Sequence, residues 1–497
     1  MTLDHLGTTD LSATDRPTSG QFAALVRHIA TTCRDPIDAL QVAAVLESDG
    51  VTDRAARDDY GHQDVFALAE AVYARLPRRP VTADPPRRRA SRRNDLRILS
   101  HGLLYAMPSA VFPAVYPLLG LPGLVTGLVF ATAFGWVWSM GSSVLAYRLL
   151  GLGHTAVAAR VLRLGMLLGL VIGAAGSAAL SWVFGLPSGV VALVVGQLGF
   201  QFAASILVLL HHERALLLLM APAVVVGLGY LLMSDTVLGG LLHGPVVSNP
   251  WAPRPVWVVS VAATCVAAAV IGGCLLTRRP GTRLEVLMVA APPPNPPPPR
   301  LRRDLVAVAP MVGYAGLSAG YLLFADTRYL NSGIDAALAV TPLVLGMGAV
   351  EWQAHWFGEA AVTLTHRCRH PVRFTRRIWV LFGRGFGTVA GVLTVLAVVL
   401  LAVLEYAGHL TGRGVILTVA HLLLAMSYFI GFILINHGRL PVLLTVSAAA
   451  LAGQVLPVVA GLPYHHGVVF LFTSASLLVV LTGALATSLA QVRRYRW

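Results

Sequence analysis

One apolar segment of this chain, residues 336–359, carries three ionisable side chains at regular spacing. Glu351, His355 and Glu359 lie four residues apart, so in a helix they share one face. A charged group within a bilayer costs roughly 2.5–3.5 kcal/mol on insertion scales. We therefore expect this face to line a polar cavity or to belong to a buried polar network. In a cavity, Glu351 paired with His355 would carry protons or bind a cation.

Two further charged residues lie near the ends of other apolar segments. Arg384 lies within the first two turns of its segment, where it would neutralise a carboxylate, meet a substrate phosphate or extend to the cytosolic surface. Asp326 lies at the outer end of its segment, where it would face the pathway or form an exposed pair with Arg328. His421 and Gln454 are single polar residues in apolar segments, and such residues are more often structural.

The first half of the chain carries amides and hydroxyls in place of charges. Gln197 and Gln201 share one helix face in one apolar segment, and Trp138 and Ser142 lie in another. Because saccharides are commonly bound through amides, hydroxyls and aromatic faces, these four residues fit a sugar-binding pathway. Hydrogen bonding between neighbouring helices is the alternative.

The apolar segments that must position these residues dominate the composition. Of the 497 residues, 56% are hydrophobic and 12% are charged, and the mean hydropathy is +0.71. A soluble protein could not bury so much apolar surface, and runs of about 20 residues are long enough to cross the ~30 Å hydrocarbon core. The sequence therefore predicts an all-α membrane protein with about twelve transmembrane helices. Their expected positions are residues 99–119, 122–146, 164–184, 187–210, 215–234, 255–277, 304–325, 336–359, 378–404, 414–436, 440–460 and 466–489.

Arginines indicate the orientation of these segments. All basic residues of the chain are arginine, and the net charge is +14. They cluster beside the apolar runs, which is the positive-inside pattern and argues against nucleic acid as a partner. With a cytosolic N-terminus, the inside loops hold 19 arginines and the outside loops only Arg254, Arg328 and Arg413. We expect a multi-pass protein of the cell (plasma) membrane with both termini cytosolic.

The segments form two sets of six. Residues 98–277 are expected to form the first six-helix bundle, and residues 304–497 the second bundle with a short basic tail. Between them, the arginine- and proline-rich residues 278–303 predict a semi-rigid cytosolic linker. Residues 1–97 predict a small helical cytosolic head followed by a basic juxtamembrane stretch. No cleavable signal peptide is expected, because residues 1–20 are polar.

Capping residues predict three helices in the head. Asp35 before Pro36 predicts the start of the first, Thr52 or Asp53 the start of a short second, and Asp64 the start of a third with an apolar face. The four cysteines of the chain are scattered, so neither a disulfide framework nor a metal site is expected. No motif implies a cofactor.

Loose motifs and a faint internal repeat connect the chain to a family of exporters. The second apolar segment runs into residues 146–154 (AYRLLGLGH) and a basic stretch at 158–162, and residues 324–328 read FADTR. Sliding the second half back by 217 positions places Arg377 against Arg160. Through these residues the chain, over positions 99–490, resembles the multidrug/oligosaccharidyl-lipid/polysaccharide exporter (MOP) superfamily, especially its polysaccharide-exporter and lipid-linked sugar flippase branch.

The resemblance implies two six-helix bundles around a central cavity. It implies a transporter, not an enzyme, that exports or flips a saccharide or lipid-linked saccharide by alternating access. A cation-coupled drug exporter of the same fold is an alternative, as is a non-transporting membrane partner of a polysaccharide synthase. Expected partners are the saccharide, membrane lipid, and a glycosyltransferase or polysaccharide synthase bound through the head.

Overall fold

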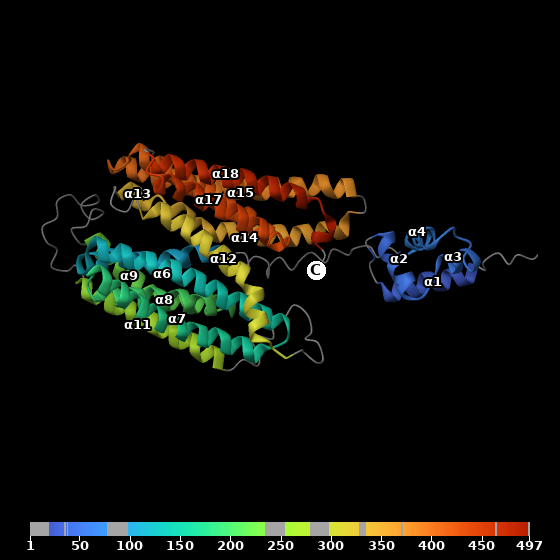
Figure 1. Ribbon diagram of the computed structural model, residues 1–497, viewed down its shortest axis with the longest axis horizontal. Helices are drawn as coiled ribbons and strands as arrows, with labels where there is room; N and C mark the ends of the chain where they lie inside the picture. Colours follow the sequence, from blue (N-terminus) through green and yellow to red (C-terminus); the bar gives the residue numbers. More distant parts are fainter. Residues whose placement is uncertain are drawn as a thin grey trace, which may run out of the picture. The chain divides into compact units, whose positions relative to one another are not determined.

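The molecule is helical in every part that the computed structural model describes (Figure 1). The described residues are 19–33, 36, 38–76, 98–233, 254–278, 298–327, 334–368, 371–462 and 465–495. Within them, 11 helical runs are long and apolar enough to cross a membrane. The predicted all-α membrane architecture is confirmed. Arg328 and most of the linker at 278–303 lie outside the described residues.

The head folds as four short helices around an apolar core of its own. In chain order these helices are α1 (Ser19–Thr32), α2 (Ala39–Ser48), α3 (Asp53–Asp58) and α4 (Val65–Arg75). The core includes five completely buried side chains, Ile29, Val42, Leu46, Leu68 and Val72. Burial on one face of each helix is what the amphipathic spacing of these residues requires.

Two of the three predicted caps in the head are present. The side chains of Thr52 and Asp64 each accept a hydrogen bond from a backbone N–H three residues further on. The remaining prediction is wrong, because Asp38 and not Asp35 caps α2. Asp38 has an extended backbone, and its carboxylate accepts the N–H of Gln41 at 2.9 Å. A cap at this position starts the helix in the register that buries its apolar face.

The first half of the transmembrane part consists of five helical runs. The longest, Ile98–Gly151, comprises residues 98–106, the 3-10 helix η1 (Met107–Val111) and α6 (Phe112–Gly151). The others are α7 (Thr155–Phe184), α8 (Gly189–Leu209), α9 (Glu213–Met233) and α11 (Pro255–Arg278).

Gly120 interrupts the longest run. Its φ of 66° and ψ of 172° are non-helical, and a positive φ is a conformation that glycine adopts readily. On the N-terminal side of Gly120 the chain follows α9 in the same direction. Leu104 packs in one apolar cluster with Leu216, and further along Ala114 packs in another with Tyr230.

On the C-terminal side of Gly120 the chain follows α8 instead. Gly123 lies against Val190, and Gly135 lies against Gln201 further along α8. A short turn at residues 210–212 joins α8 to α9, so the two helices run in opposite directions. The run Ile98–Gly151 therefore divides at Gly120 into parts that follow helices of opposite direction, and a division into six crossings per half stays a prediction.

The second half contributes six further membrane-length helices. They are α12 (Leu301–Asp326), α14 (Thr341–Arg367), α15 (Pro371–Tyr406), α16 (Gly412–Asn436), α17 (Leu440–Val459) and α18 (His466–Leu489). The short α13 (Ile334–Leu338) precedes α14, and the 3-10 helix η3 (Val492–Tyr495) follows α18. Most residues of α16 are buried, which makes it the central helix of this half.

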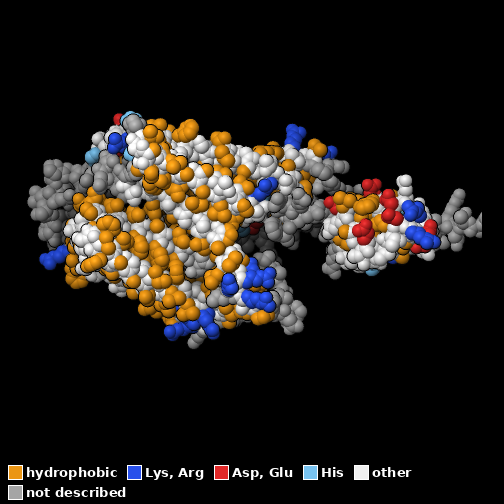
Figure 2. Space-filling view, in the orientation of Figure 1, with side chains coloured by type: hydrophobic (Ala, Val, Ile, Leu, Met, Phe, Trp, Pro, Cys, Tyr) orange, Lys and Arg blue, Asp and Glu red, His pale blue; other side chains and the backbone are white. Residues whose placement is uncertain are grey.

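The flanks of the transmembrane helices expose large apolar side chains. Trp182, Leu218, Phe472 and Val479 are each at least 70% exposed. Figure 2 shows apolar side chains spread over the visible flank, with arginines near the ends of the helices. Apolar exposure on this scale belongs against lipid rather than water. The chain is a multi-pass membrane protein.

Several contacts join the halves among the described residues, including that of Trp136 on α6 with Tyr428 on α16. α12 packs along α6 (Figure 1). Residues 98–106 cross α14 at Gly102 and Gly348, where the backbones meet without intervening side chains. A Cβ added to Gly102 would meet the carbonyl oxygen of Leu345, and one added to Gly348 would meet that of Leu99.

We expect Gly348→Ala to destabilise the protein, because the added methyl group meets backbone that cannot rotate away. Overpacking of this kind costs about 1–3 kcal/mol. Gly358→Ala, in the same helix, is the matched control, since nothing lies within 4 Å of its added Cβ. Thermal denaturation in detergent, followed by size-exclusion chromatography, measures the difference. Equal melting temperatures for the two variants would contradict the close crossing.

Candidate functional site

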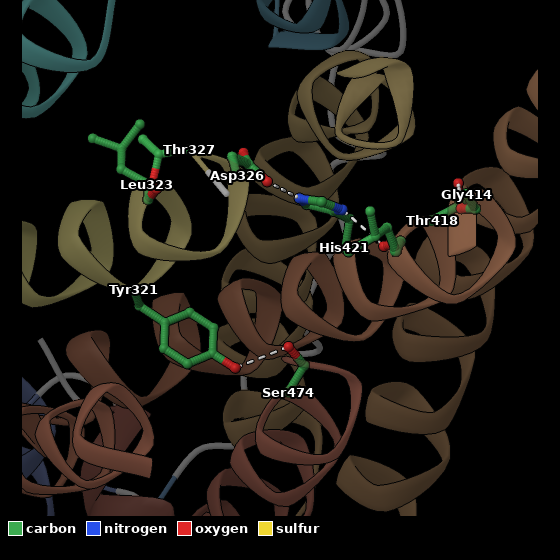
Figure 3. A network of polar contacts seen from close by, with 9 residues as sticks. Tyr321, Leu323, Asp326, Thr327, Gly414, Thr418, His421 and Ser474 are labelled. Atoms are coloured by element: carbon green, nitrogen blue, oxygen red, sulfur yellow. Dashed lines mark hydrogen bonds and ion pairs between the residues drawn. The ribbon is translucent and has the colours of Figure 1, made fainter. Parts of the chain in front are cut away.

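A carboxylate and a histidine meet within the second half. Asp326, the last residue of α12, lies with its Oδ1 2.9 Å from Nε2 of His421 on α16 (Figure 3). The other ring nitrogen of His421, Nδ1, lies 2.8 Å from the carbonyl oxygen of Leu417, one turn earlier. The His421 side chain is 1% exposed and that of Asp326 22% exposed. The sequence placed these two residues in separate roles, and the fold brings them together.

These contacts require the pair to hold a proton. The carbonyl oxygen of Leu417 can only accept, so Nδ1 of His421 must donate. A neutral histidine protonated on Nδ1 presents a lone pair at Nε2, and an ionised Asp326 presents lone pairs as well. Two acceptors 2.9 Å apart need a hydrogen between them. Either His421 is an imidazolium or the carboxyl of Asp326 is protonated.

Hydroxyl groups continue this polar region into the core of the second half. The hydroxyl of Tyr321, on α12, lies 2.9 Å from those of both Thr473 and Ser474 on α18 (Figure 3). A small cavity nearby is lined by aromatic and aliphatic hydroxyls together with four apolar residues. The hydroxyl-bearing residues are Tyr314, Ser318, Tyr321, Ser427, Tyr428 and Ser447. The Tyr428 hydroxyl is buried without a hydrogen-bond partner among the described residues. Such a group can bind a water molecule.

Glu351 bonds to residues of the first half. Its Oε2 lies 2.7 Å from Nδ1 of His101, and its Oε1 accepts the hydroxyl of Tyr105 at 2.8 Å. On the other side of the ring, Nε2 of His101 lies 3.8 Å from Oε1 of Glu213, the first residue of α9. We call His101, Tyr105, Glu213 and Glu351 the inter-half cluster. Its side chains come from three separate helical segments.

The other predicted charged residues do not join this cluster. His355 and Glu359 continue the face of Glu351 along α14, and both are exposed. Arg384 is exposed on α15. A place for these three residues on a substrate or ion pathway stays a prediction.

The predicted sugar-binding residues of the first half lie among its packed helices. The indole N–H of Trp138 donates to the carbonyl oxygen of Gly165 on α7 at 2.6 Å. Ser142 lies beside the same glycine. Gln201 lies against α6 with its amide oxygen buried, and Gln197 is partly exposed on the same helix. The contacts of Trp138 and Ser142 are of the helix-to-helix kind that was the alternative interpretation. Their role in a pathway also stays a prediction.

A salt bridge joins the halves at a second place. Nε of Arg148, near the end of α6, lies 2.9 Å from Oδ1 of Asp304, near the start of α12. The Asp304 side chain is 5% exposed and that of Arg148 37% exposed. Asp304 is therefore a largely buried carboxylate that relies on an arginine of the other half.

Sequence reasoning missed His101, Glu213, Arg148 and Asp304 as site residues. Each lies near the end of an apolar run, where a charged residue is commonly solvated, so spacing alone gives no signal. The signal that could have indicated two of them is the scarcity of acidic residues in and beside the apolar segments. Asp304 and Glu213 stand among arginine-rich or apolar neighbours, and an acid in such a place is a candidate for pairing.

Within the described ranges, no group of three or more histidine, cysteine or acidic residues could hold a metal ion. None of the four cysteines, all of them described, forms a disulfide.

Comparison with known proteins gives matches among solved structures only. No family model matches the chain, and no curated protein matches it. A MATE transporter in complex with MaD5 is similar at 14% identity over 80% of this chain and 97% of that chain, with a TM-score of 0.45. A eukaryotic MATE transporter is similar at 12% identity over 80% and 96%, with a TM-score of 0.43.

A further similar structure is the inward-facing conformation of a multidrug resistance MATE family transporter of the MOP superfamily. It is 14% identical over 81% of this chain and 98% of that chain, with a TM-score of 0.37. None of these three structures is described as a polysaccharide exporter or a flippase.

We expect Arg148→Met to destabilise the protein more than Asp304→Asn does. Removing the arginine leaves the buried Asp304 carboxylate without its partner, which lowers the free energy of unfolding by about 1–3 kcal/mol. An asparagine at position 304 is neutral, so it can be buried without an arginine as partner. Melting temperatures of both single variants and of the double variant measure the effect. The double variant should melt above Arg148→Met. A lower melting temperature for Asp304→Asn than for Arg148→Met would contradict the assignment.

Proposed function

We propose that this protein is a membrane transporter whose two six-helix halves give alternating access to a central pathway, and that a proton bound by Asp326 and His421 drives it. The observation that carries this proposal is the contact between two groups that must share a proton in the interior of the second half. Ionisable groups placed within a membrane are typical of proton relays in transporters.

The organisation of the helices supports transport over a static role. Two bundles of six crossings, separated by a linker, are the arrangement in which one bundle can rock against the other. The contacts between the halves include charged groups, at Arg148 with Asp304 and at His101 with Glu351. Such charge contacts can form in one conformation of the transporter and break in another. Apolar packing alone allows this exchange less readily.

For the substrate, we favour a small amphipathic molecule exported in exchange for protons over a saccharide. The residues that suggested sugar binding, Trp138 and Ser142, contact α7 within the first bundle. The buried contact of Asp326 with His421 fits proton coupling, which supports a cation-coupled exporter. Export of a saccharide, and membership of the polysaccharide-exporter branch, remain the sequence-based expectation.

The head is proposed as a docking module. Its four helices have their own core, so it can present a surface independently of the membrane helices. A glycosyltransferase or polysaccharide synthase as its partner, and a cytosolic location for both termini in the cell membrane, stay predictions.

We expect Asp326→Asn and His421→Gln to abolish proton-driven transport. Each removes one member of the proton-binding pair, so transport should fall by about tenfold or more. The assay uses the full-length protein in liposomes with an imposed pH gradient and ethidium, a lipophilic cation, as the probe. Proton flux is followed with a pH-sensitive dye inside the liposomes.

Asp335→Asn is the matched control. Asp335 is also buried, but it accepts hydrogen bonds from the backbone N–H and hydroxyl of Thr411, the residue that caps α16, and asparagine can still accept them. Transport by this variant should stay close to wild type. Wild-type rates in Asp326→Asn would overturn the coupling site. Translocation of a lipid-linked saccharide without any effect of the pH gradient would overturn the function.

A further inference from the structure

The inter-half cluster places one histidine between two carboxylates. His101 faces Glu351 through Nδ1 at 2.7 Å and Glu213 through Nε2 at 3.8 Å. The side chains of His101, Glu213 and Glu351 are 11%, 4% and 25% exposed. An imidazolium has an N–H on each nitrogen. Its Nδ1–H can donate to Glu351, and its Nε2, which makes no hydrogen bond among the described residues, faces Glu213 at ion-pair distance. A neutral imidazole has only one N–H.

Two more titratable groups face this cluster. The Tyr105 hydroxyl donates to Glu351 from the same helical segment as His101. Nδ1 of His211, in the turn between α8 and α9, lies 4.0 Å from Oε1 of Glu213, and its side chain is 46% exposed. His211 therefore lies near water, whereas His101 is nearly enclosed.

The cluster lies beside the closest approach of the two halves. His101 precedes Gly102, which meets α14 backbone to backbone, and Glu351 lies one turn after Gly348 on α14. His101, Tyr105 and Glu213 belong to the first half and Glu351 to the second. Separating the helices at this crossing necessarily breaks the bonds of Glu351 to His101 and Tyr105.

We infer that His101 is a second proton-binding site, separate from Asp326 and His421, and that its proton holds the two halves together at this end of the bundle. With the proton bound, one positive charge lies between a carboxylate of each half. Without it, the attraction across the crossing is lost, and two negative groups remain on either side of a neutral ring. In a site shielded from water, both effects are stronger than they would be at a surface.

This inference rests on the proposed function, because it assigns the site to one state of a transporter with two moving halves. Proton binding closes the end at which residues 98–106 and α9 begin. Proton release opens that end and frees the site for the next cycle. The ligand is a proton, and the device is the charge contact between His101 and Glu351.

The test measures distances between spin labels in the full-length protein in lipid nanodiscs, with the four native cysteines replaced by serine. One pair is Ala156→Cys at the start of α7 and Asn436→Cys at the end of α16, both exposed at the end that carries the cluster. A second pair, Ser188→Cys and Tyr406→Cys, reports the opposite end. Raising the pH from about 5.5 to about 9 should move the first pair from a short to a long distance in at least about half of the molecules. The second pair should shorten.

Glu351→Gln and His101→Gln should each remove the pH dependence and leave the first pair at the long distance. Tyr105→Phe is the matched control, because it removes a hydrogen bond to Glu351 without changing charge, and it should keep the pH response. A pH response that persists in both charge variants would overturn the inference, as would a wild-type protein whose distances do not change with pH. The wild-type titration decides this even if a variant fails to fold.

The distance measurement needs no substrate, so it separates this inference from the proposed function. If the distances between the spin labels do not change with pH while Asp326→Asn still abolishes transport, the inference about His101 is wrong and the proposed function stands. If the distances follow pH while no proton-driven transport occurs in any preparation, the proposed function fails. The cluster is then a pH-sensitive contact without a role in transport.

Discussion

The scarcity of water inside a helical bundle governs the buried polar contacts between the transmembrane helices. A lone carboxylate or imidazolium there costs several kcal/mol, so each such group must have a partner or a proton. Three contacts meet this demand, at Asp326 with His421, at Glu351 with His101 and at Asp304 with Arg148. Two of them join the halves. The need to pair buried charged groups therefore also determines where the two halves can separate.

The fold could be predicted from the sequence to a large extent because it depends on the length and polarity of segments. Runs of about 20 apolar residues have few alternatives to a membrane-spanning helix. The six-and-six division was predicted from the same runs, and in the structure a single non-helical residue, Gly120, interrupts the longest helical run. The cap at Asp38 was missed because two aspartates three residues apart suit the same role.

The partners of the ionisable residues could not be predicted, because they are distant in sequence. Glu351 and His101 are 250 positions apart, whereas Glu351 and His355 share a face at a spacing that suggests a pair. Spacing shows which residues lie on one face of a helix, but not which helix covers that face. His421 was given a structural role for the same reason, since its partner Asp326 belongs to another helix. Both halves hold a carboxylate–histidine contact within their own bundle, Glu213 with His101 in the first and Asp326 with His421 in the second.

The central claim is that Asp326 and His421 hold a proton between them. Nitrogen-15 spectra of histidine-labelled protein, compared with those of His421→Gln, would identify the protonation state of that ring. Infrared difference spectra against Asp326→Asn would identify the state of the carboxyl group. We expect an imidazolium at His421 or a protonated carboxyl at Asp326. A neutral His421 beside an ionised Asp326 would contradict it.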